Sequence, residues 1–142
     1  MVYGWRDRQL NMNTPERIAE FQRAVQRLDE ALQAGTDNSL FIDAAIQRFE
    51  FCVELAWKSL AKVLERDHAI MVASPKSAVQ AAYQVGMIDD EPAWVAMLRD
   101  RNLTSHTYRE ALAREIHQRL PDHQHRLSLL VECLTHGHSS ER

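Results

Sequence analysis

The chain has 142 residues and 45% hydrophobic residues, which suits one compact domain large enough to bury its own core. Its 17 basic and 20 acidic residues give a formal charge of −3, which argues against a protein that coats nucleic acid mainly by neutralising phosphates. No apolar run approaches the roughly 20 residues of a membrane span, and the polar residues 1–13 lack a secretory signal, so we expect a cytoplasmic protein without a membrane segment.

Only four glycines and four prolines interrupt the chain, so helices should dominate. Thr14 followed by Pro15 predicts the start of a first helix, with Thr14 as its N-cap, and Gly35 predicts its end. Between them, apolar residues recur at alternating steps of three and four and form one stripe: Ile18, Phe21, Val25, Leu28 and Leu32. This pattern is typical of a helix in an antiparallel bundle.

A second helix is predicted from about Leu40 to about Asp67, with one long apolar stripe. Phe51, Cys52 and Leu55 form a second apolar sector beside that stripe. Exposing both sectors would leave a large apolar patch in water, so this helix is expected to be central in its fold or covered by another chain. Of the two, we favour a second copy of the chain as the cover. Cys52 is expected to be a small reduced core residue, because its pattern is helical and the other cysteine is distant in sequence.

Three charged residues of the same helix, Glu50, Glu54 and Lys58, follow one another at steps of four. Such a stripe is usually a solvated face with an ordinary ion pair worth about 0.2–0.5 kcal/mol. The alternative is that the stripe reaches a functional cleft and orients Arg101.

Two shorter helices are predicted next. Ser74-Pro75 predicts the start of one, which ends at Gly86, and Asp90 or Asp89 before Pro92 predicts the cap of the other. The second of these carries Arg101 near its C-terminal end. Its core-facing residues are predicted to be Trp94, Val95 and Leu98, with Met97 as a further candidate.

Thr107-x-x-Glu110 matches a capping box and predicts a last helix that runs toward Leu134, with a kink or break near Pro121. Its histidines His117, His123 and His125 could suggest a metal site. However, His123 and His125 point apart on a helix, and no carboxylate has the spacing to complete a ligand set. We therefore predict that all three lie on the surface. The domain should therefore comprise residues 14–135, between an N-terminal extension (1–13) and a flexible tail (136–142).

Arg101 and His106 are the strongest candidates for chemistry. On one continuous helix they would be rotated by about 140° from each other, whereas a turn near Asn102 would bring both side chains into one cleft. A histidine just outside a helix N-terminus beside a guanidinium could act on a phosphodiester without a metal ion. Tyr108 could contact the substrate or be modified. The alternative is structural: both residues cap carbonyls or pair with carboxylates such as Asp100 or Glu110.

Arg101-x4-His106-x-Tyr108 resembles the Arg-x(4–6)-His-x-Tyr signature of the HEPN superfamily. Residues 47–58, 74–76, 86–88 and 100–108 are similar to a narrower group, the nucleotidyltransferase substrate-binding proteins, which are HEPN partners of minimal nucleotidyltransferases (MNT) in paired operons. The similarity spans about residues 16–134.

The resemblance implies an all-α, up-and-down bundle of four to five helices that forms a homodimer. It also implies a toxin–antitoxin pair in which this chain is a metal-independent endoribonuclease without a cofactor. Arg101 and His106 would be the catalytic pair, Asn102 a polar support, and Tyr108 the residue that the partner silences by AMPylation. The family name implies an alternative, a non-catalytic subunit that holds a nucleotide or other substrate for its partner.

RNA contact would have to be local in so acidic a chain. Arg99 and Arg109, with Arg114 farther along, form the basic cluster nearest to the motif, and we expect them to contact RNA.

Overall fold

A computed structural model of the chain describes residues 13–136. These residues form five α-helices and one short 3-10 helix, and they contain no strand. In chain order the elements are α2 (Thr14–Gln33), α3 (Ser39–His68), α4 (Pro75–Gln84), α5 (Glu91–Leu103), η1 (Thr104–His106) and α6 (Glu110–His136). The predicted all-helical fold is confirmed.

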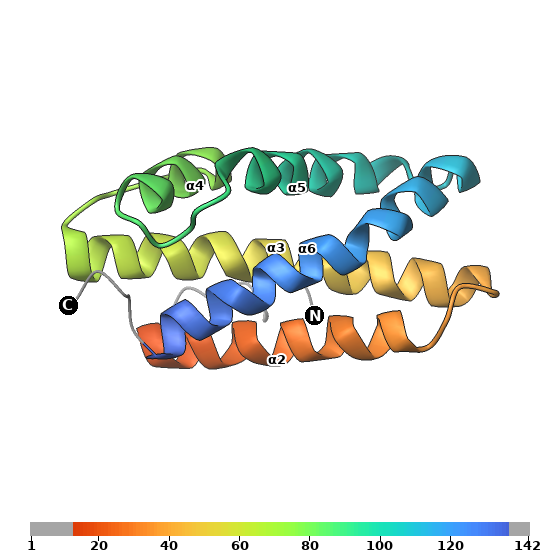
Figure 1. Cartoon of the computed structure of the whole chain (residues 1–142), viewed down its shortest axis with the longest axis horizontal. Coiled ribbons are helices and arrows are strands. Elements are labelled where there is room, and N and C mark those ends of the chain that lie inside the picture. Colours follow the sequence, from red (N-terminus) through yellow and green to blue (C-terminus); the bar gives the residue numbers. More distant parts are fainter. Residues whose placement is uncertain (1–12, 137–142) are drawn as a thin grey trace.

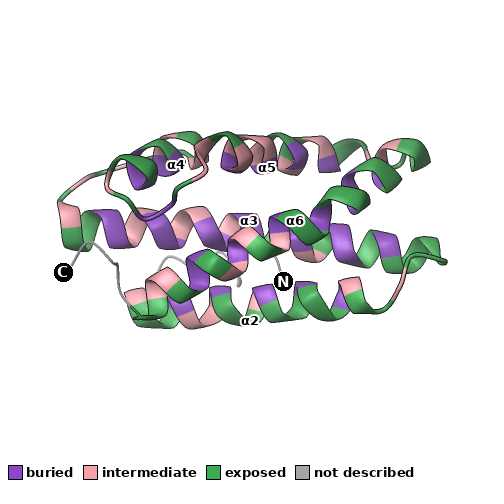
Figure 2. Cartoon of the chain, viewed as in Figure 1, coloured by how far each residue is buried: buried purple, intermediate pink, exposed green. Residues whose placement is uncertain are grey.

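The longest helix, α3, forms the centre of the bundle (Figure 1). α2 packs antiparallel along one side of α3, and α4 and α5 lie along another side. α6 starts beside the end of α5, crosses α3 and α2 with contacts to both, and ends near the start of α2. The buried residues lie on the faces that the helices turn toward one another (Figure 2). This arrangement places the 101–108 segment at one end of the bundle.

Two predicted helix starts are confirmed. Ser74 caps α4, because its hydroxyl accepts the N–H of Ser77 at 3.1 Å. Asp90 rather than Asp89 caps α5, because its carboxylate accepts the N–H of Ala93 at 3.2 Å. Both caps use a short acceptor side chain before a helix that has proline in its first turn.

The cap of α2 differs from the prediction. Asn13, and not Thr14, accepts the N–H of Glu16 at 2.9 Å, so Thr14 is already helical. An asparagine is as good an N-cap as a threonine or better, and it moves the helix start by one residue. Of the predicted N-terminal extension only Asn13 is described, and of the predicted tail only His136; the remainder of both lies outside the described residues.

The predicted capping box of the last helix is wrong. α6 begins at Glu110, and the hydroxyl of Thr107 donates to the carbonyl of Thr104 at 3.0 Å instead of capping α6. The carbonyl of Arg109 accepts the N–H of Ala113 at 3.0 Å, so the backbone of Arg109 opens the helix. The reason is that η1 follows α5 directly and has Thr107 as its C-cap residue, whose hydroxyl is used within this last turn.

α6 also corrects the prediction for two histidines. His117 and His123 are buried, with 7% and 5% exposed, while His125 is exposed. Steps of three or four place both buried histidines on the stripe that carries Leu120 and Leu127, and this stripe faces the core. The helix continues through Pro121 without a break.

The second apolar sector of α3 is only partly buried within this chain. Cys52 and Leu55 are buried within this chain, whereas Phe51 keeps 47% of its surface exposed. Burial raises the pKa of the Cys52 thiol to about 12, so Cys52 is a core residue rather than a reactive thiol. Among residues 13–136, no helix has the length and hydrophobicity needed to cross a bilayer.

Candidate active site at the end of α5

The guanidinium of Arg101 lies between two carboxylates of α3. Its Nη1 is 3.6 Å from Glu50 Oε2, and its Nη2 is 3.9 Å from Glu54 Oε2. Glu54 is also 3.5 Å from Lys58 Nζ. The charged stripe of α3 therefore reaches Arg101, and the interpretation as a merely solvated face is wrong. These distances exceed the 2.7–3.2 Å of a hydrogen bond, so the carboxylates attract the guanidinium without engaging its N–H groups closely.

Thr104, the first residue of η1, connects this cluster to the backbone. Its hydroxyl oxygen is 2.7 Å from Glu50 Oε2 and 2.6 Å from the carbonyl oxygen of Arg101. A hydroxyl has a single proton, so it donates to one of these acceptors at a time. Thr104 is 6% exposed, which shields both contacts from water. Glu50 is thereby tied to the same turn that carries Arg101.

Asp100 faces the interior, although it precedes Arg101. Its carboxylate accepts two hydrogen bonds from Arg119, each 2.8 Å long, and lies 2.8 Å from Nε2 of His123. The imidazole of His123 stacks on Phe49, with ring centroids 5.3 Å apart. Consecutive residues of a helix point about 100° apart, so Asp100 is not the partner of Arg101.

The pKa of Asp100 reflects two opposing effects. Burial by itself raises the pKa of a carboxyl group, but the hydrogen bonds and positive charges of Arg119 and His123 outweigh it and lower the pKa below its ordinary value. Asp100 is therefore an ionised anchor that joins the end of α5 to α6.

His106 and Tyr108 lie on the outer surface of the same end of the bundle. Tyr108 is 80% exposed, and its ring lies edge-on to His106 with centroids 6.1 Å apart. The helix that was predicted to end near Asn102 ends one residue later, at Leu103, and η1 follows directly in place of the predicted link. Within residues 13–136, no hydrogen bond or ion pair joins Arg101 to His106.

A groove of about 480 Å³ opens beside Arg101, between α3, the start of α4 and α5. Asn102 and Arg99 line it on the α5 side. Val95 was predicted to face the core, but it is only half-buried and lines this groove, whereas Leu98 packs against the core and also borders the groove. The groove therefore combines charged and apolar side chains next to the motif.

The remaining predicted basic residues lie closer to Tyr108. Arg109 is exposed, and Arg114 is exposed and bound to Glu110 at 3.1 Å. A hollow of about 270 Å³ extends beside Tyr108 toward the start of α3 and is bordered by Arg114 and Asp43. Basic residues thus flank the 101–108 segment on two sides.

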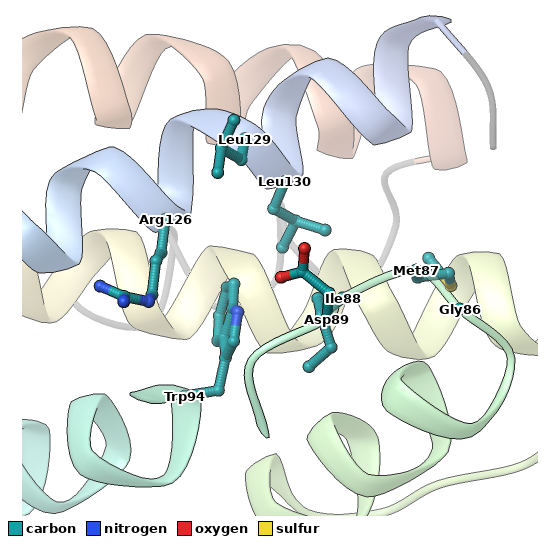
Figure 3. Close-up of a pocket in the computed structure, with 8 residues that line it drawn as sticks. All are labelled: Gly86, Met87, Ile88, Asp89, Trp94, Arg126, Leu129 and Leu130. Carbon is teal, nitrogen blue, oxygen red and sulfur yellow. The ribbon is translucent and has the colours of Figure 1, made fainter. Parts of the chain in front are cut away.

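Another hollow, of about 210 Å³, lies near the start of α5 (Figure 3). It is bordered by Trp94 and by Arg126 of α6. The guanidinium of Arg126 is bound to Asp90 at 3.2 Å and to Asp122 at 3.4 Å. This hollow is remote from the motif along α5, and its arginine is already neutralised, so it is a poor candidate for an anionic substrate.

Comparison with known proteins shows the family to which the chain belongs. The family model described as "Nucleotidyltransferase substrate binding protein like" matches residues 16–135. The chain belongs to this family. A curated member from Haemophilus influenzae, named probable ribonuclease HepT, is 33% identical over 107 residues, which cover 72% of this chain and 73% of that protein. The resemblance drawn from the motif is thus confirmed, and homology supports an endoribonuclease as a candidate activity.

Two solved structures of related proteins have the same fold. A protein from Thermus thermophilus superposes with a TM-score of 0.77 at 36% identity, over 80% of this chain and 98% of that one. A protein from Haemophilus influenzae superposes with a TM-score of 0.75 at 28% identity, over 83% of this chain and 98% of that one. The latter is described as showing the fold of a substrate-binding domain of a nucleotidyltransferase. A nucleotidyltransferase is accordingly the suggested partner of this family.

Sequence reasoning did not single out Thr104, which contacts both Glu50 and the backbone of Arg101. It gave Glu50 a role beside Arg101 only as the alternative to a solvated face. The one available signal was the step of four between Glu50 and Glu54, which places both carboxylates on one helix face but does not say what that face meets. For metal binding, residues 13–136 contain no group of three histidine, cysteine, aspartate or glutamate side chains suited to hold an ion.

Proposed function

We propose that this chain is a homodimeric HEPN-type endoribonuclease that acts as the toxin of a toxin–antitoxin pair. The observation that carries the proposal is the guanidinium of Arg101, which Glu50 and Glu54 hold at the end of α5 without close hydrogen bonds. Its two terminal Nη groups are therefore available to a phosphate, whereas its Nε is buried, and His106 lies exposed on the following turn. The homology to a probable ribonuclease supports the same activity.

The reaction follows from the chemistry of RNA. The 2′-hydroxyl attacks the adjacent phosphorus, its proton leaves, and the 5′-oxygen departs with a proton, which produces a 2′,3′-cyclic phosphate. In this proposal His106 transfers a proton, Arg101 stabilises the charge that develops on the phosphoryl oxygens, and Asn102 supports the phosphate as a polar neighbour. Arg99 and Arg109 contact the flanking RNA backbone. The proposed reaction uses no metal or cofactor.

The exposure of Tyr108 supports a proposed control by AMPylation. Its hydroxyl oxygen would attack the α-phosphorus of ATP on a partner minimal nucleotidyltransferase, and pyrophosphate would leave. A side chain that is 80% exposed is accessible to such an enzyme, and its ring contacts His106. The added phosphate and nucleoside would place negative charge and bulk across the path of the RNA.

Cleavage of labelled RNA by the purified chain tests the activity. We expect Arg101→Ala and His106→Ala each to lower the rate at least about 100-fold, because general acid–base and electrostatic stabilisation each contribute that much or more. Arg23→Ala and His125→Ala are matched controls that remove an exposed arginine of α2 and an exposed histidine of α6. Undiminished cleavage by both motif variants would refute the assignment.

The intact mass of the chain tests the control by AMPylation. Incubation with a partner minimal nucleotidyltransferase and ATP should add one or more AMP units, and Tyr108→Phe should abolish the addition. Tyr83→Phe is the control, because Tyr83 is also exposed, at 47%. An unchanged mass of the wild-type chain, or continued addition to the Tyr108→Phe variant, would contradict the proposal.

A second candidate is a non-catalytic subunit that holds a nucleotide or another substrate for a nucleotidyltransferase. It is supported by the family description and by the related Haemophilus influenzae structure. This function predicts a stable complex with the nucleotidyltransferase and no cleavage of any RNA by the unmodified chain. The cleavage assay therefore separates the two candidates.

A further inference from the structure

The groove beside Arg101 has the dimensions of a small-ligand site. Its volume of about 480 Å³ lies within the range of roughly 300–1,000 Å³ that is typical of such sites. The hollows beside Tyr108 and Trp94 are smaller, at about 270 and 210 Å³. The groove is thus the largest of these three candidates.

Three cationic side chains line this groove: Lys76 from the first turn of α4, and Arg99 and Arg101 from α5. The lining contains one carboxylate, Glu54, which is already within ion-pair distance of Lys58 and Arg101. Within residues 13–136, neither Lys76 nor Arg99 forms an ion pair. Since the whole chain carries a formal charge of −3, the groove is a local site of positive charge in an acidic protein.

The same groove offers apolar surface next to these cations. Val53, Pro75, Val95 and Leu98 contribute aliphatic atoms to its lining. A simple anion gains no binding free energy from apolar surface. A nucleotide, in contrast, presents a phosphate to the cations and a flat, weakly polar base to the aliphatic side chains. The combination therefore favours a nucleotide over a simple anion.

Arg101 belongs both to this groove and to the proposed catalytic pair. We propose that the groove binds one nucleotide of single-stranded RNA next to the scissile phosphate, with Lys76 and Arg99 on its backbone phosphate and its base against Val95 and Leu98. This inference rests on the proposed ribonuclease function and names the part of the chain that holds the substrate. Lys76 becomes a substrate-binding residue that lies 25 positions before Arg101 in the sequence.

The affinity for RNA and its dependence on salt measure how much the charges of Lys76 and Arg99 contribute to binding. The His106→Ala chain, which is not expected to cleave, is titrated into a labelled single-stranded RNA of about ten nucleotides, and anisotropy is followed at several salt concentrations. We expect Lys76→Ala and Arg99→Ala each to weaken binding about fivefold and to make the slope of log K against log [salt] shallower by about 0.7. A fold defect alone would leave that slope unchanged, and thermal unfolding of each variant checks for one.

Arg23→Ala is the matched control for charge, because Arg23 is an exposed arginine of α2, which does not border the groove. Val95→Trp tests the apolar part. We expect it to weaken RNA binding by filling the groove while the salt slope stays as in the parent chain. Unchanged affinity and slope in the Lys76→Ala/Arg99→Ala double variant would overturn the proposal.

Two further measurements distinguish failure of the groove proposal from failure of the proposed ribonuclease function. AMP is added as a competitor, and AMP binding without RNA binding would overturn the assignment to RNA. The wild-type chain is also assayed for cleavage. If it cleaves RNA and the groove variants bind and cleave like the wild type, the inference fails while the proposed function stands. If it never cleaves but RNA binding depends on Lys76 and Arg99, the groove stands and the ribonuclease function fails.

Discussion

At the scale of single residues, the environment of Arg101 differs from that of its neighbour Asp100. Arg101 is half-buried near two carboxylates that leave its N–H groups free of close hydrogen bonds, whereas Asp100 is 4% exposed and engaged by Arg119 and His123. A rotation of about 100° along the helix separates the two environments. One residue thus serves the proposed chemistry, and the other anchors the helix that presents it.

Thr104→Val removes the hydroxyl that connects Glu50 with the turn carrying Arg101. We expect a loss of about 1 kcal/mol in the free energy of unfolding, because one hydrogen bond of a buried hydroxyl disappears while the shape is kept. We also expect slower RNA cleavage, since Glu50 is no longer held beside Arg101. Urea denaturation and the cleavage assay measure the two effects. Ser105→Ala, which removes an exposed hydroxyl of the same turn, should change neither; equal effects of both variants would contradict the role of Thr104.

Asp100→Asn is expected to lower the free energy of unfolding by about 2 kcal/mol at pH 7, because hydrogen bonds to a charged group are lost. The pKa of Asp100 is lower in the folded chain than its ordinary value of about 3.9, so its ionised form stabilises the fold above that pH. This stabilisation is lost as the pH falls through the folded-state pKa. The difference between wild type and variant should therefore narrow below about pH 4, as measured by urea denaturation at a series of pH values.

Asp122→Asn is the control for this pH series. Asp122 also pairs with an arginine of α6, but its side chain is 81% exposed, and exposed pairs contribute at most about 1 kcal/mol. A difference for Asp100→Asn that does not depend on pH would show that the ionisation of Asp100 does not stabilise the fold.

At the scale of elements, helix starts depend on short acceptor side chains, and two of these caps were predicted correctly. Ser74 and Asp90 cap their helices as their neighbouring prolines suggested. The capping box predicted at Thr107 is wrong, although its Thr-x-x-Glu pattern is typical of a helix start, because the Thr107 hydroxyl is hydrogen-bonded to the carbonyl of Thr104 in η1. A capping pattern therefore predicts a cap only where the preceding residues are not already helical.

Asp90→Ala should destabilise the start of α5 and lower the free energy of unfolding by about 1 kcal/mol, the usual cost of losing an N-cap. Arg126 also loses a partner, which adds to the effect. Asp89→Ala is the matched control, because Asp89 is the exposed neighbour that does not cap the helix. Thermal unfolding followed by circular dichroism measures both variants. A similar shift in the two would contradict the assignment of the cap.

At the scale of the whole molecule, a single chain presents Arg101 and His106 without a direct bond between them. In the proposed homodimer the motifs of two subunits face one cleft, and Phe51, 47% exposed on α3, is the aromatic residue expected in the covered face. A cleft shared by two subunits would allow the arginine of one to act with the histidine of the other.

Mixing inactive subunits tests this arrangement. We expect Arg101→Ala and His106→Ala chains to regain part of the RNA-cleaving activity when they exchange subunits, because each mixed dimer keeps one intact arginine and one intact histidine. Light scattering should show the dimer mass, and each variant mixed only with itself is the control. Native mass spectrometry verifies that the subunits have exchanged. If the mixed dimers form and the RNA-cleaving activity does not recover, the shared site is contradicted.

Sequence alone determined the helical class, most helix bounds and the position of the 101–108 segment at a helix end. These properties depend on interactions between residues three or four positions apart, which periodicity and capping residues report. The tertiary structure alone decided that Glu50 and Thr104 meet across 54 positions, that His123 is buried against Asp100, and that Lys76 joins Arg99 in one groove. Such contacts depend on how each helix is rotated against its neighbours, and a stripe on one helix does not specify which surface it will meet.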